Sequence, residues 1–590
     1  MKTEETQFRR NLFEIENARN LTRDEIVATF VPTKSFHRLL SAKNHIVLGA
    51  RGSGKTVLAR MLSHDYLSRC QDRVAREAVQ AKAYLGLYVT TSIEWVGSLK
   101  NKPWQSEAEQ EEFFQWRLNI AACRALLVSL KSCCDFYAPS PAASAMLEHD
   151  MSLVFSRDWS DGTHQSQTFR DLRSYLDEVE HQRQLAVLRR RAQVADERPM
   201  PGLEFETPLF SPLRRAIRKA SDALGIPEEA AWLLCIDEAE FLEPLHQRVL
   251  NSHMRADSGN LNFKITTMPY AHQSLQTNTR EPLSEGNDFE YVYIDRDPIT
   301  HTTNDEAAEL FANRLFRKRA DVSGFRYSKL TLTDLLGPSV LLDDKSASWA
   351  AESTEMGLLR KHGSRETVAR AERLHGTPEF RDQIARKVHG ALLLKNAVGS
   401  IEGREELQLY AGARMVVRCG DGNPRRLIRI CNALLQRRGN QRRVPAIVQN
   451  RVLATFSTST LTRVRSEPTV GPHLHRFIEY IGHFMSVALH EQPVTTDQVS
   501  SIEVDEAVSD FHWELIKRAV GLGLLFPNIS IKNPDHMPER EGVFHLAYVL
   551  APHFRLLPRR GKSRKLSHLL VGAPSFEEAA AQPELFGESA

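Results

Sequence analysis

The sequence Gly49-Ala-Arg-Gly-Ser-Gly-Lys-Thr56 decides the fold of this chain, because it fits the pattern G-x-x-x-x-G-K-[ST] at every fixed position. The β-branched run HIVL at 45–48 precedes it. A helix with apolar residues at helical spacing is expected to follow, from Lys55 to about Leu67. The pattern alone arises by chance, but between a strand and an amphipathic helix it predicts a phosphate-binding loop.

The residue types in this loop suit polyphosphate chemistry. The glycines let the backbone curl so that successive N–H groups and the helix N-terminus point at a phosphate. Lys55 is expected to reach the β- and γ-phosphates, where it would act in catalysis, and Thr56 to offer its hydroxyl to Mg²⁺. We therefore predict that ATP and Mg²⁺ bind through the whole loop, which comprises Gly49, Ala50, Arg51, Gly52, Ser53, Gly54, Lys55 and Thr56.

Short apolar runs alternate with helical patterns in the first half of the chain, which predicts an α/β fold with a parallel sheet. The expected strands are residues 45–48, 85–89, 230–236, 263–267 and 291–294. A polar, helical stretch from about 138 to 210 interrupts the alternation. We interpret that stretch as an insertion.

Two acidic residues, Asp237 and Glu238, directly follow the apolar run AAWLLCI at 230–236. Acidic pairs at strand ends are common, but after a phosphate-binding loop the arrangement is typical of a Walker B motif. Asp237 is then expected to hold Mg²⁺, and Glu238 to activate water as a general base. Thr267, at the end of the next strand, is expected to orient that water, and Glu240 to be structural.

The chain turns helical from about 301 to 445, with a second polar insertion at about 338–400. The segment GDGNPRRL at 420–427 predicts a sharp helix start from which Arg425 projects. Such an arginine is either a solvated helix terminus or a group that reaches the γ-phosphate and makes closure of a helical lid depend on nucleotide. Its place after the other motifs favours the second interpretation.

The last folded part, about 460–572, reads as two helices joined by a Thr/Asp/Ser connector and followed by strands at 524–529 and 542–550. This order indicates a winged helix, and the tail at 573–590 is expected to be disordered. Basic residues near its end either neutralise DNA phosphates or keep a surface soluble. They are Arg555, Arg559, Arg560, Lys562, Arg564 and Lys565.

Composition bounds the function classes. The formal net charge is only +3 over 590 residues, so the whole chain is not a basic nucleic-acid binder. No apolar run approaches the roughly 18 residues that span a bilayer, and the N-terminus has no signal-peptide pattern. The seven dispersed cysteines fit reduced thiols in apolar cores. These features predict a cytoplasmic protein without a membrane partner.

Taken together, the motifs resemble those of AAA+ ATPases of the origin-recognition initiator clade, and most closely their bacterial origin-recognition-like relatives. The resemblance covers roughly residues 20–135, 228–300 and 405–570. It implies a P-loop NTPase sheet forming an AAA+ core (21–300, after an N-terminal lead at 1–20), a helical lid (301–445) and a C-terminal winged-helix domain. It carries Lys55, Asp237 and Glu238 over as ATPase residues and Arg425 as a second sensor.

The resemblance also implies a homo-oligomer, because AAA+ sites are completed by an arginine from a neighbouring subunit. Arg280 and Arg255 are candidates for that arginine. The segment 24–30 would flank the adenine. The chain departs from the family in having Thr267 where the first sensor is often Asn, and in its long insertions.

Two functions follow from these expectations. The first is a Mg²⁺-dependent ATPase switch that assembles and acts on DNA or on a DNA-associated partner; by analogy, the insertions point to a role in bacterial defence against phage. The second is a signalling ATPase, similar to STAND switches, that senses a trigger and activates a separate effector protein without binding DNA. No effector chemistry of its own stands out in the sequence.

Overall fold

The computed structural model describes residues 10–571 except 101–105, 161, 163, 192–199, 257–258, 296–304, 326–328, 344–352, 401–407 and 529–539. The predicted disordered tail lies outside the described residues. The chain divides into two compact units. The N-terminal unit comprises Leu21–Gly49 and Gly54–Ile294, and the C-terminal unit comprises Met1–Asn20, Ala50–Ser53 and Asp295–Ala590.

A five-stranded sheet forms the core of the N-terminal unit, with the strand order β2-β3-β4-β1-β5. Every neighbouring pair is parallel, as the alternation of strands and helices predicts. All five predicted strands are confirmed within one residue or two at each end. They are β1 (His45–Leu48), β2 (Tyr84–Thr90), β3 (Ala231–Asp237), β4 (Leu261–Thr267) and β5 (Glu290–Tyr293).

Strands β1 and β3 are buried along their whole length, which explains why both read as continuous apolar runs. Between them lies β4, whose Thr267 pairs with Leu48 at the end of β1. Because the strands are parallel, the residues that follow β1, β3 and β4 meet at the carboxyl edge of the sheet. That edge positions the candidate site.

Short helices precede the first strand or lie in the connections between strands. They are α1 (Arg23–Thr29), α2 (Lys34–Leu39), α3 (Lys55–Leu62), α4 (His64–Leu67), α5 (Arg73–Gln80), α6 (Ile93–Lys100) and α11 (Pro244–Arg255). The single helix expected over 55–67 is two helices, because Ser63 adopts extended backbone angles. Its hydroxyl donates to the Arg60 carbonyl at 2.7 Å, a local bond that competes with helix continuation.

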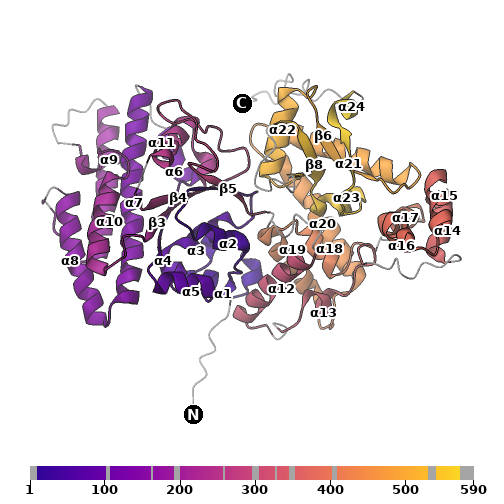
Figure 1. Ribbon diagram of the computed structural model, residues 1–590, viewed down its shortest axis with the longest axis horizontal. Coiled ribbons are helices and arrows are strands. Elements are labelled where there is room, and N and C mark those ends of the chain that lie inside the picture. The colour runs from indigo at the N-terminus through magenta and orange to yellow at the C-terminus, as the bar shows by residue number, and fades with distance from the viewer. Residues whose placement is uncertain are drawn as a thin grey trace, which may run out of the picture. The chain divides into compact units, whose positions relative to one another are not determined.

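Long helices stand side by side at one end of this unit (Figure 1): α7 (Glu107–Tyr137), α8 (Pro141–Trp159), α9 (Phe169–Arg191) and α10 (Ser211–Leu224). The stretch interpreted as an insertion supplies α8, α9 and the short 3-10 helix η3 (Leu203–Phe205), so its helical character is confirmed. Phe155, Trp159 and Phe205 form a buried aromatic cluster there. Glu180 of α9 pairs with Arg117 and Arg124 of α7 at 2.8 and 2.6 Å.

The C-terminal unit is mainly helical from α12 to α20. Its helices are α12 (Asp305–Val322), α13 (Leu332–Leu336), α14 (Thr354–His362), α15 (Arg365–Leu374), α16 (Pro378–Phe380), α17 (Arg386–Gly399), α18 (Ala413–Cys419), α19 (Pro424–Arg438) and α20 (Ala446–Val464). The predicted start of α19 is confirmed: Asn423 caps the helix and accepts from the amide of Arg426. The predicted insertion at about 338–400 contains α14 to α17.

A second, four-stranded sheet follows, in the order β7-β8-β6-β9. Its elements are α21 (Gly471–His490), β6 (Val499–Val504), α22 (Asp510–Gly521), β7 (Leu525–Pro527), β8 (Gly542–Leu546), η7 (Tyr548–Leu550), α23 (Ala551–Phe554), β9 (Lys562–Lys565) and α24 (Leu566–Leu570). The predicted strand pair is confirmed as β7 and β8, but β8 ends at Leu546, and residues 548–550 of the predicted second strand form the 3-10 helix η7. The predicted connector contains a strand, β6, and the basic stretch contains β9. The winged-helix assignment itself stays a prediction.

None of the helices in the described ranges is both long and apolar enough to cross a membrane. All seven cysteines are buried and free of disulfides, which confirms that they serve as core residues.

Candidate functional site

The phosphate-binding loop leaves the sheet at the carboxyl end of β1. The Gly49 amide donates to the Thr267 carbonyl at 3.3 Å, which extends the β1–β4 ladder by one bond. Gly54 has φ +102° and caps α3, a conformation that favours glycine. Lys55, the first residue of α3, is buried, and its Nζ donates to the Gly49 carbonyl at 2.8 Å. The lysine ammonium therefore lies inside the curl of the loop.

Asp237 is the last residue of β3 and is completely buried. Its carboxylate accepts hydrogen bonds from the Thr266 hydroxyl (2.5 Å) and the Tyr88 phenol (2.9 Å). Burial, followed by the neighbouring Asp237 charge, raises the pKa of Tyr88 well above its ordinary value. The phenol thus stays protonated as a donor. Both partners of this carboxylate in the described residues are neutral.

Glu238 has a left-handed backbone, with φ +65°. This region is strained for a residue with a Cβ, and such strain clusters at functional sites. The Glu238 amide donates to the Thr266 hydroxyl at 3.3 Å, and its carboxylate accepts from the Thr90 hydroxyl at 3.3 Å. The turn at Glu238 re-aims its side chain relative to the preceding Asp237.

Glu240 lies in the short 3-10 helix η4 (Ala239–Phe241) that follows this turn. Burial raises the pKa of Glu240, and the positive charge of Lys55 opposes that rise. Glu240 therefore lies within electrostatic reach of the loop lysine.

Thr266 is the residue that sequence reasoning missed. Its hydroxyl links the Asp237 carboxylate to the Glu238 amide, whereas the Thr267 hydroxyl has only a weak contact of 3.5 Å to the Met268 carbonyl. The role of Thr266 follows from the register between β3 and β4. Ile236 pairs with Ile265, so the residues that follow them, Asp237 and Thr266, lie on the same face of the sheet. That register is not readable from a single run of residues. The role predicted for Thr267 stays a prediction.

The middle of the loop, Ala50–Ser53, belongs to the C-terminal unit, where it packs on the start of α19. The Asn423 side chain donates to the Arg51 carbonyl at 3.0 Å. The Arg425 amide points at the Gly52 carbonyl, at 3.4 Å. Gly52 has φ +91°, and a Cβ there would lie 2.9 Å from Asn423 Oδ1 and 3.1 Å from the Arg425 Cβ. Glycine is therefore required at this position for both conformation and space.

Two cations lie close together in this part of the C-terminal unit. Burial, with Arg51 next, lowers the pKa of Arg425. The Nε atom of Arg425 is buried without a hydrogen-bond partner. Arg51 pairs with Glu467 at 3.3 Å. Such a pair of guanidinium groups beside a glycine loop is suited to an anion.

The candidates for a trans-acting arginine lie in one region of the N-terminal unit. Arg255 ends α11 and pairs with Glu281 at 2.8 Å, and Arg280 is the exposed residue just before that glutamate. The predicted adenine-flanking segment corresponds to α1, which begins with the capping box of Thr22 and Glu25.

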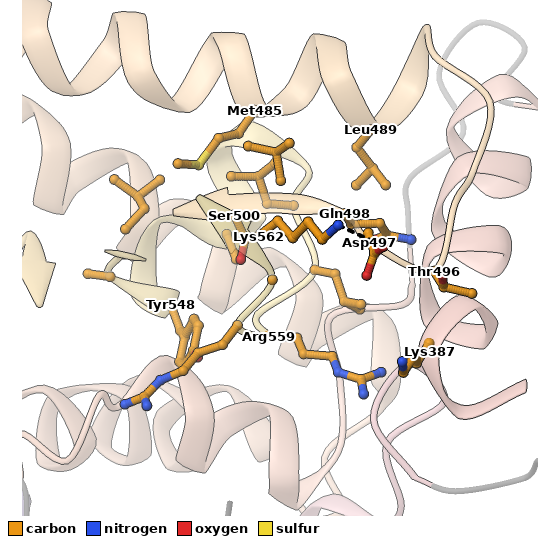
Figure 2. A pocket seen from close by; sticks show the side chains of 18 residues that line it. Lys387, Met485, Leu489, Thr496, Asp497, Gln498, Ser500, Tyr548, Arg559 and Lys562 are labelled. Atoms are coloured by element: carbon orange, nitrogen blue, oxygen red, sulfur yellow. Dashed lines mark ion pairs between the residues drawn. The ribbon is translucent and has the colours of Figure 1, made fainter. Parts of the chain in front are cut away.

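The six basic residues near the C-terminus do not form one uniform patch. Arg559 donates to the Arg386 carbonyl, and Lys562 pairs with Asp497 at 2.9 Å. Arg564 and Lys565 are exposed on β9, an edge strand of the second sheet. Arg559, Arg560 and Lys562 line a cavity (Figure 2), and Lys562 is also the first residue of β9. Arg555 belongs to neither the cavity lining nor the strand.

The residues present fit a magnesium nucleotide. The loop has left-handed glycines at 52 and 54, a buried lysine and the hydroxyl of Thr56 at the start of α3. The buried Ser53 hydroxyl has no hydrogen-bond partner. Asp237 adds a carboxylate with neutral partners, a hard oxygen ligand of the kind that Mg²⁺ prefers.

A comparison with protein families now adds an independent finding. The sequence model of the ORC-CDC6-like family matches residues 11–566, nearly the whole chain. A search of curated proteins finds no significant match. The chain belongs to the ORC-CDC6-like family, which confirms the predicted origin-recognition resemblance and implies an AAA+ nucleotide-binding core.

Proposed function

We propose that this ORC-CDC6-like protein binds ATP with Mg²⁺ and hydrolyses it, and that hydrolysis drives a conformational switch acting on DNA. The observation that carries the proposal is the Asp237–Glu238 pair at the carboxyl edge of the sheet, one strand away from the phosphate-binding loop. Thr266, on the strand between, contacts both acidic residues.

The surroundings of Asp237 support metal binding. A buried carboxylate is costly unless a positive charge or enough hydrogen bonds compensate it. Asp237 is 0% exposed, and its described partners are two neutral hydroxyl groups. A divalent cation would pair directly with this carboxylate, which the Arg60 guanidinium reaches only through space, and Thr56 would be a further oxygen ligand.

The remaining residues have distinct roles in the proposed reaction. Bound Mg²⁺–ATP supplies the phosphoryl group and the cation that neutralises its charge. Lys55 leaves the Gly49 carbonyl to pair with phosphate oxygens, since an ammonium gains more from an anion than from a neutral carbonyl. Glu238 takes the proton of the attacking water at its carboxylate, and Thr90 holds that carboxylate in place.

A pair of lysine variants tests nucleotide binding. Lys55→Ala should abolish ATP binding and hydrolysis. Lys43→Ala removes an exposed lysine that pairs with Glu290 away from the loop, and it should leave both intact. Equal activity of wild type and Lys55→Ala would show that the loop is not the ATP site.

We further propose that α19 couples nucleotide to the C-terminal unit through Arg425. Within that unit, Arg425 and Asn423 already contact the loop segment Ala50–Ser53. Arg425→Ala should therefore retain ATP binding but lower hydrolysis. Arg437→Ala, in the exposed last turn of the same helix, is the matched control and should have no effect.

Family membership and the exposed cations of β9 support DNA as the object of the switch. DNA should stimulate ATP hydrolysis, and binding should weaken steeply with salt because each neutralised phosphate releases counterions. Charge reversal at Arg564 and Lys565 should remove the stimulation. Cations on an edge strand have a second explanation, because they prevent aggregation through that edge. If no DNA changed the ATPase activity, the result would favour the alternative, a signalling switch that activates a separate effector protein.

Self-association is the remaining part of the proposal. Arg255 or Arg280 would complete the site of a neighbouring copy. The variant of whichever arginine acts should lower hydrolysis and regain activity when mixed with a Glu238→Gln partner that still carries its own arginines. Light scattering with ATP should show assemblies larger than one chain.

A further inference from the structure

The middle of the phosphate-binding loop is bonded to the end of α22 as well as to α19. Within the C-terminal unit, the Arg51 amide donates to the Gly521 carbonyl at 2.9 Å, and the Arg51 carbonyl accepts from the Asn423 side chain at 3.0 Å. The loop passes so close to the residues after α22 that a Cβ on Gly523 would lie 3.2 Å from the Ala50 Cβ. Since α22 leads directly into β7, these contacts join the loop to the second sheet.

Three charged side chains form a bridge in the same region. The Arg51 guanidinium pairs with one carboxylate oxygen of Glu467 at 3.3 Å, and the Arg518 guanidinium of α22 pairs with the other at 2.8 Å. Glu467 lies in the connection between α20 and α21, and only 15% of its side chain is exposed. A single carboxylate therefore holds a loop residue and α22 together.

The two halves of this bridge differ in exposure. The Arg51 side chain is 66% exposed, whereas that of Arg518 is 38% exposed. An exposed ion pair contributes little in water, so Arg51 can leave it at small cost. Glu467 would still be paired with Arg518, so no partly buried carboxylate would lose its last cation. The bridge is therefore weakest at Arg51.

A phosphate bound by the loop would be a stronger ligand for Arg51 than Glu467 is. Guanidinium groups bind phosphate through two parallel hydrogen bonds, and a terminal phosphate carries more charge than a carboxylate. Burial, and then the charge of Arg51, lowers the pKa of Arg425, so the two arginines are close enough to repel each other. An anion that binds both guanidinium groups would relieve this repulsion.

We propose that Arg51 exchanges Glu467 for the terminal phosphate of ATP, and that this exchange loosens the contact between the loop and α22. This role of Arg51 requires that the loop binds ATP, as proposed above, and it names the residues through which the nucleotide acts on the C-terminal unit. ADP lacks the terminal phosphate and leaves Arg51 on Glu467. Glu467 is a positioning residue, because it affects the nucleotide only through Arg51.

Isosteric replacement of the carboxylate tests this role. In Glu467→Gln, Arg51 has no anionic competitor for the phosphate. The imido-bridged analogue of ATP, which is not hydrolysed, should therefore bind about two- to fivefold more tightly than it binds wild type. ADP should gain less. Calorimetric titration of the full-length chain measures both affinities, and a purely structural carboxylate would give unchanged or weaker binding.

Two further variants show whether Glu467 acts through Arg51. In an Arg51→Ala chain, Glu467→Gln should no longer change the affinity for the analogue, because the residue that connects Glu467 to the phosphate is gone. Glu514→Gln is the matched control in the wild-type chain. It removes an exposed carboxylate of α22 that pairs with Lys517 outside the bridge, and it should leave the affinity unchanged.

Hydrogen exchange measures the effect on α22 itself. The amides of Leu522, Gly523 and Leu524 donate to carbonyls in the last turn of this helix. In wild type they should exchange at least about threefold faster with the analogue than with ADP, because the end of the helix loses its hold on the loop. The difference should vanish in Arg51→Ala, a change that the fold should tolerate because this side chain is 66% exposed.

The outcomes separate this role of Arg51 from the ATP proposal. If wild type binds the analogue but Glu467→Gln does not raise the affinity, the role of Arg51 alone is overturned. A gain that persists in the Arg51→Ala chain, or exchange at the end of α22 that is equal with the analogue and with ADP, would overturn it as well. If wild type binds neither nucleotide, the ATP proposal fails and the role of Arg51 fails with it.

Discussion

Two buried aspartates, one in each unit, are held in opposite ways. Asp237, in the N-terminal unit, accepts from the hydroxyls of Thr266 and Tyr88. Asp421, in the C-terminal unit, pairs with Arg426 at 2.8 Å and accepts from the backbone amides of Tyr548 (2.7 Å) and Val549 (3.0 Å). The direct hydrogen-bond partners of the first carboxylate are neutral, with the Arg60 guanidinium within electrostatic reach. The second carboxylate is bonded directly to a cation and to two amides.

The difference separates a binding carboxylate from a structural one. A buried acid that is already paired has no capacity left for a metal, whereas one with only hydroxyl donors is stabilised when a cation arrives. Through its bonds to the amides of Tyr548 and Val549, Asp421 links the turn before α19 to the residues after β8. Asp237 is placed to receive Mg²⁺.

The largest effect is expected from Asp237→Asn. Loss of the carboxylate should lower Mg²⁺-dependent ATP hydrolysis by about 10³-fold or more, since a metal contributes several kcal/mol of charge stabilisation in such sites. The thermal midpoint should stay the same or rise, because a buried charge without a direct ion pair disappears. Steady-state hydrolysis and calorimetry measure the two quantities. A large loss of stability would mean that Asp237 is structural.

The same substitution at Asp421 should lower the stability of the protein, whereas Asp237→Asn should lower its activity. Asp421 has φ +52°, which asparagine also tolerates, so the variant tests charge rather than backbone strain. Asp421→Asn should destabilise the C-terminal unit by about 3–5 kcal/mol, because Arg426 stays buried without its carboxylate. Urea unfolding followed by tryptophan fluorescence measures the change. Unaltered stability would remove the contrast between the two aspartates.

A smaller effect separates the two threonines at the end of β4. Thr266→Ala should weaken Mg²⁺ dependence or hydrolysis by about 10–100-fold, the usual cost of losing a group that orients a metal ligand. Thr267→Ala should lower hydrolysis less, since the Thr267 hydroxyl does not contact Asp237 and so does not orient that carboxylate. Titration of activity with Mg²⁺ distinguishes the variants. Equal effects would show that Thr267 acts directly on water, as its place in the sequence predicts.

The smallest effect concerns a third buried charge, Lys264 on β4. Its Nζ donates to the Ser41 carbonyl (2.9 Å) and contacts His45 Nδ1 (2.8 Å), which are neutral partners. Burial lowers its pKa from 10.5 to about 7. The unfolded chain therefore binds more protons between these values, so this contribution to stability is complete above about pH 10.5 and is lost as the pH falls through about 7.

Lys264→Met should remove that pH dependence. The thermal midpoint of the variant relative to wild type should rise as the pH is lowered from about 9 to about 6. A difference that stays constant over this range would show that Lys264 keeps its charge in the folded protein.

The sequence predicted the parts of the site that are local along the chain. The loop, the acidic pair after 230–236 and the helix start at Pro424 each depend on a few consecutive residues, and the structure confirms their elements. Thr266 was missed because its role depends on the register between β3 and β4. Asp421 was missed because its amide partners lie 127 and 128 residues away.

The arrangement of the basic stretch also depends on pairing between residues that are far apart in the chain. Its composition predicted one cationic cluster, but Arg559 and Arg560 line the cavity before β9, whereas Arg564 and Lys565 are exposed on β9 outside the cavity lining. The division depends on the parallel pairing of β9 with β6, which brings residues some sixty positions apart into register. Charge counts along a sequence cannot show such a pairing.

The most direct test of the central claim is Glu238→Gln, measured for ATP binding and for ATP turnover in the same preparation. We expect ATP binding to be retained while hydrolysis falls by about 10²–10⁴-fold, because the general base is lost and the fold is not. Hydrolysis at the wild-type rate would contradict the assignment of Asp237 and Glu238 as the catalytic pair.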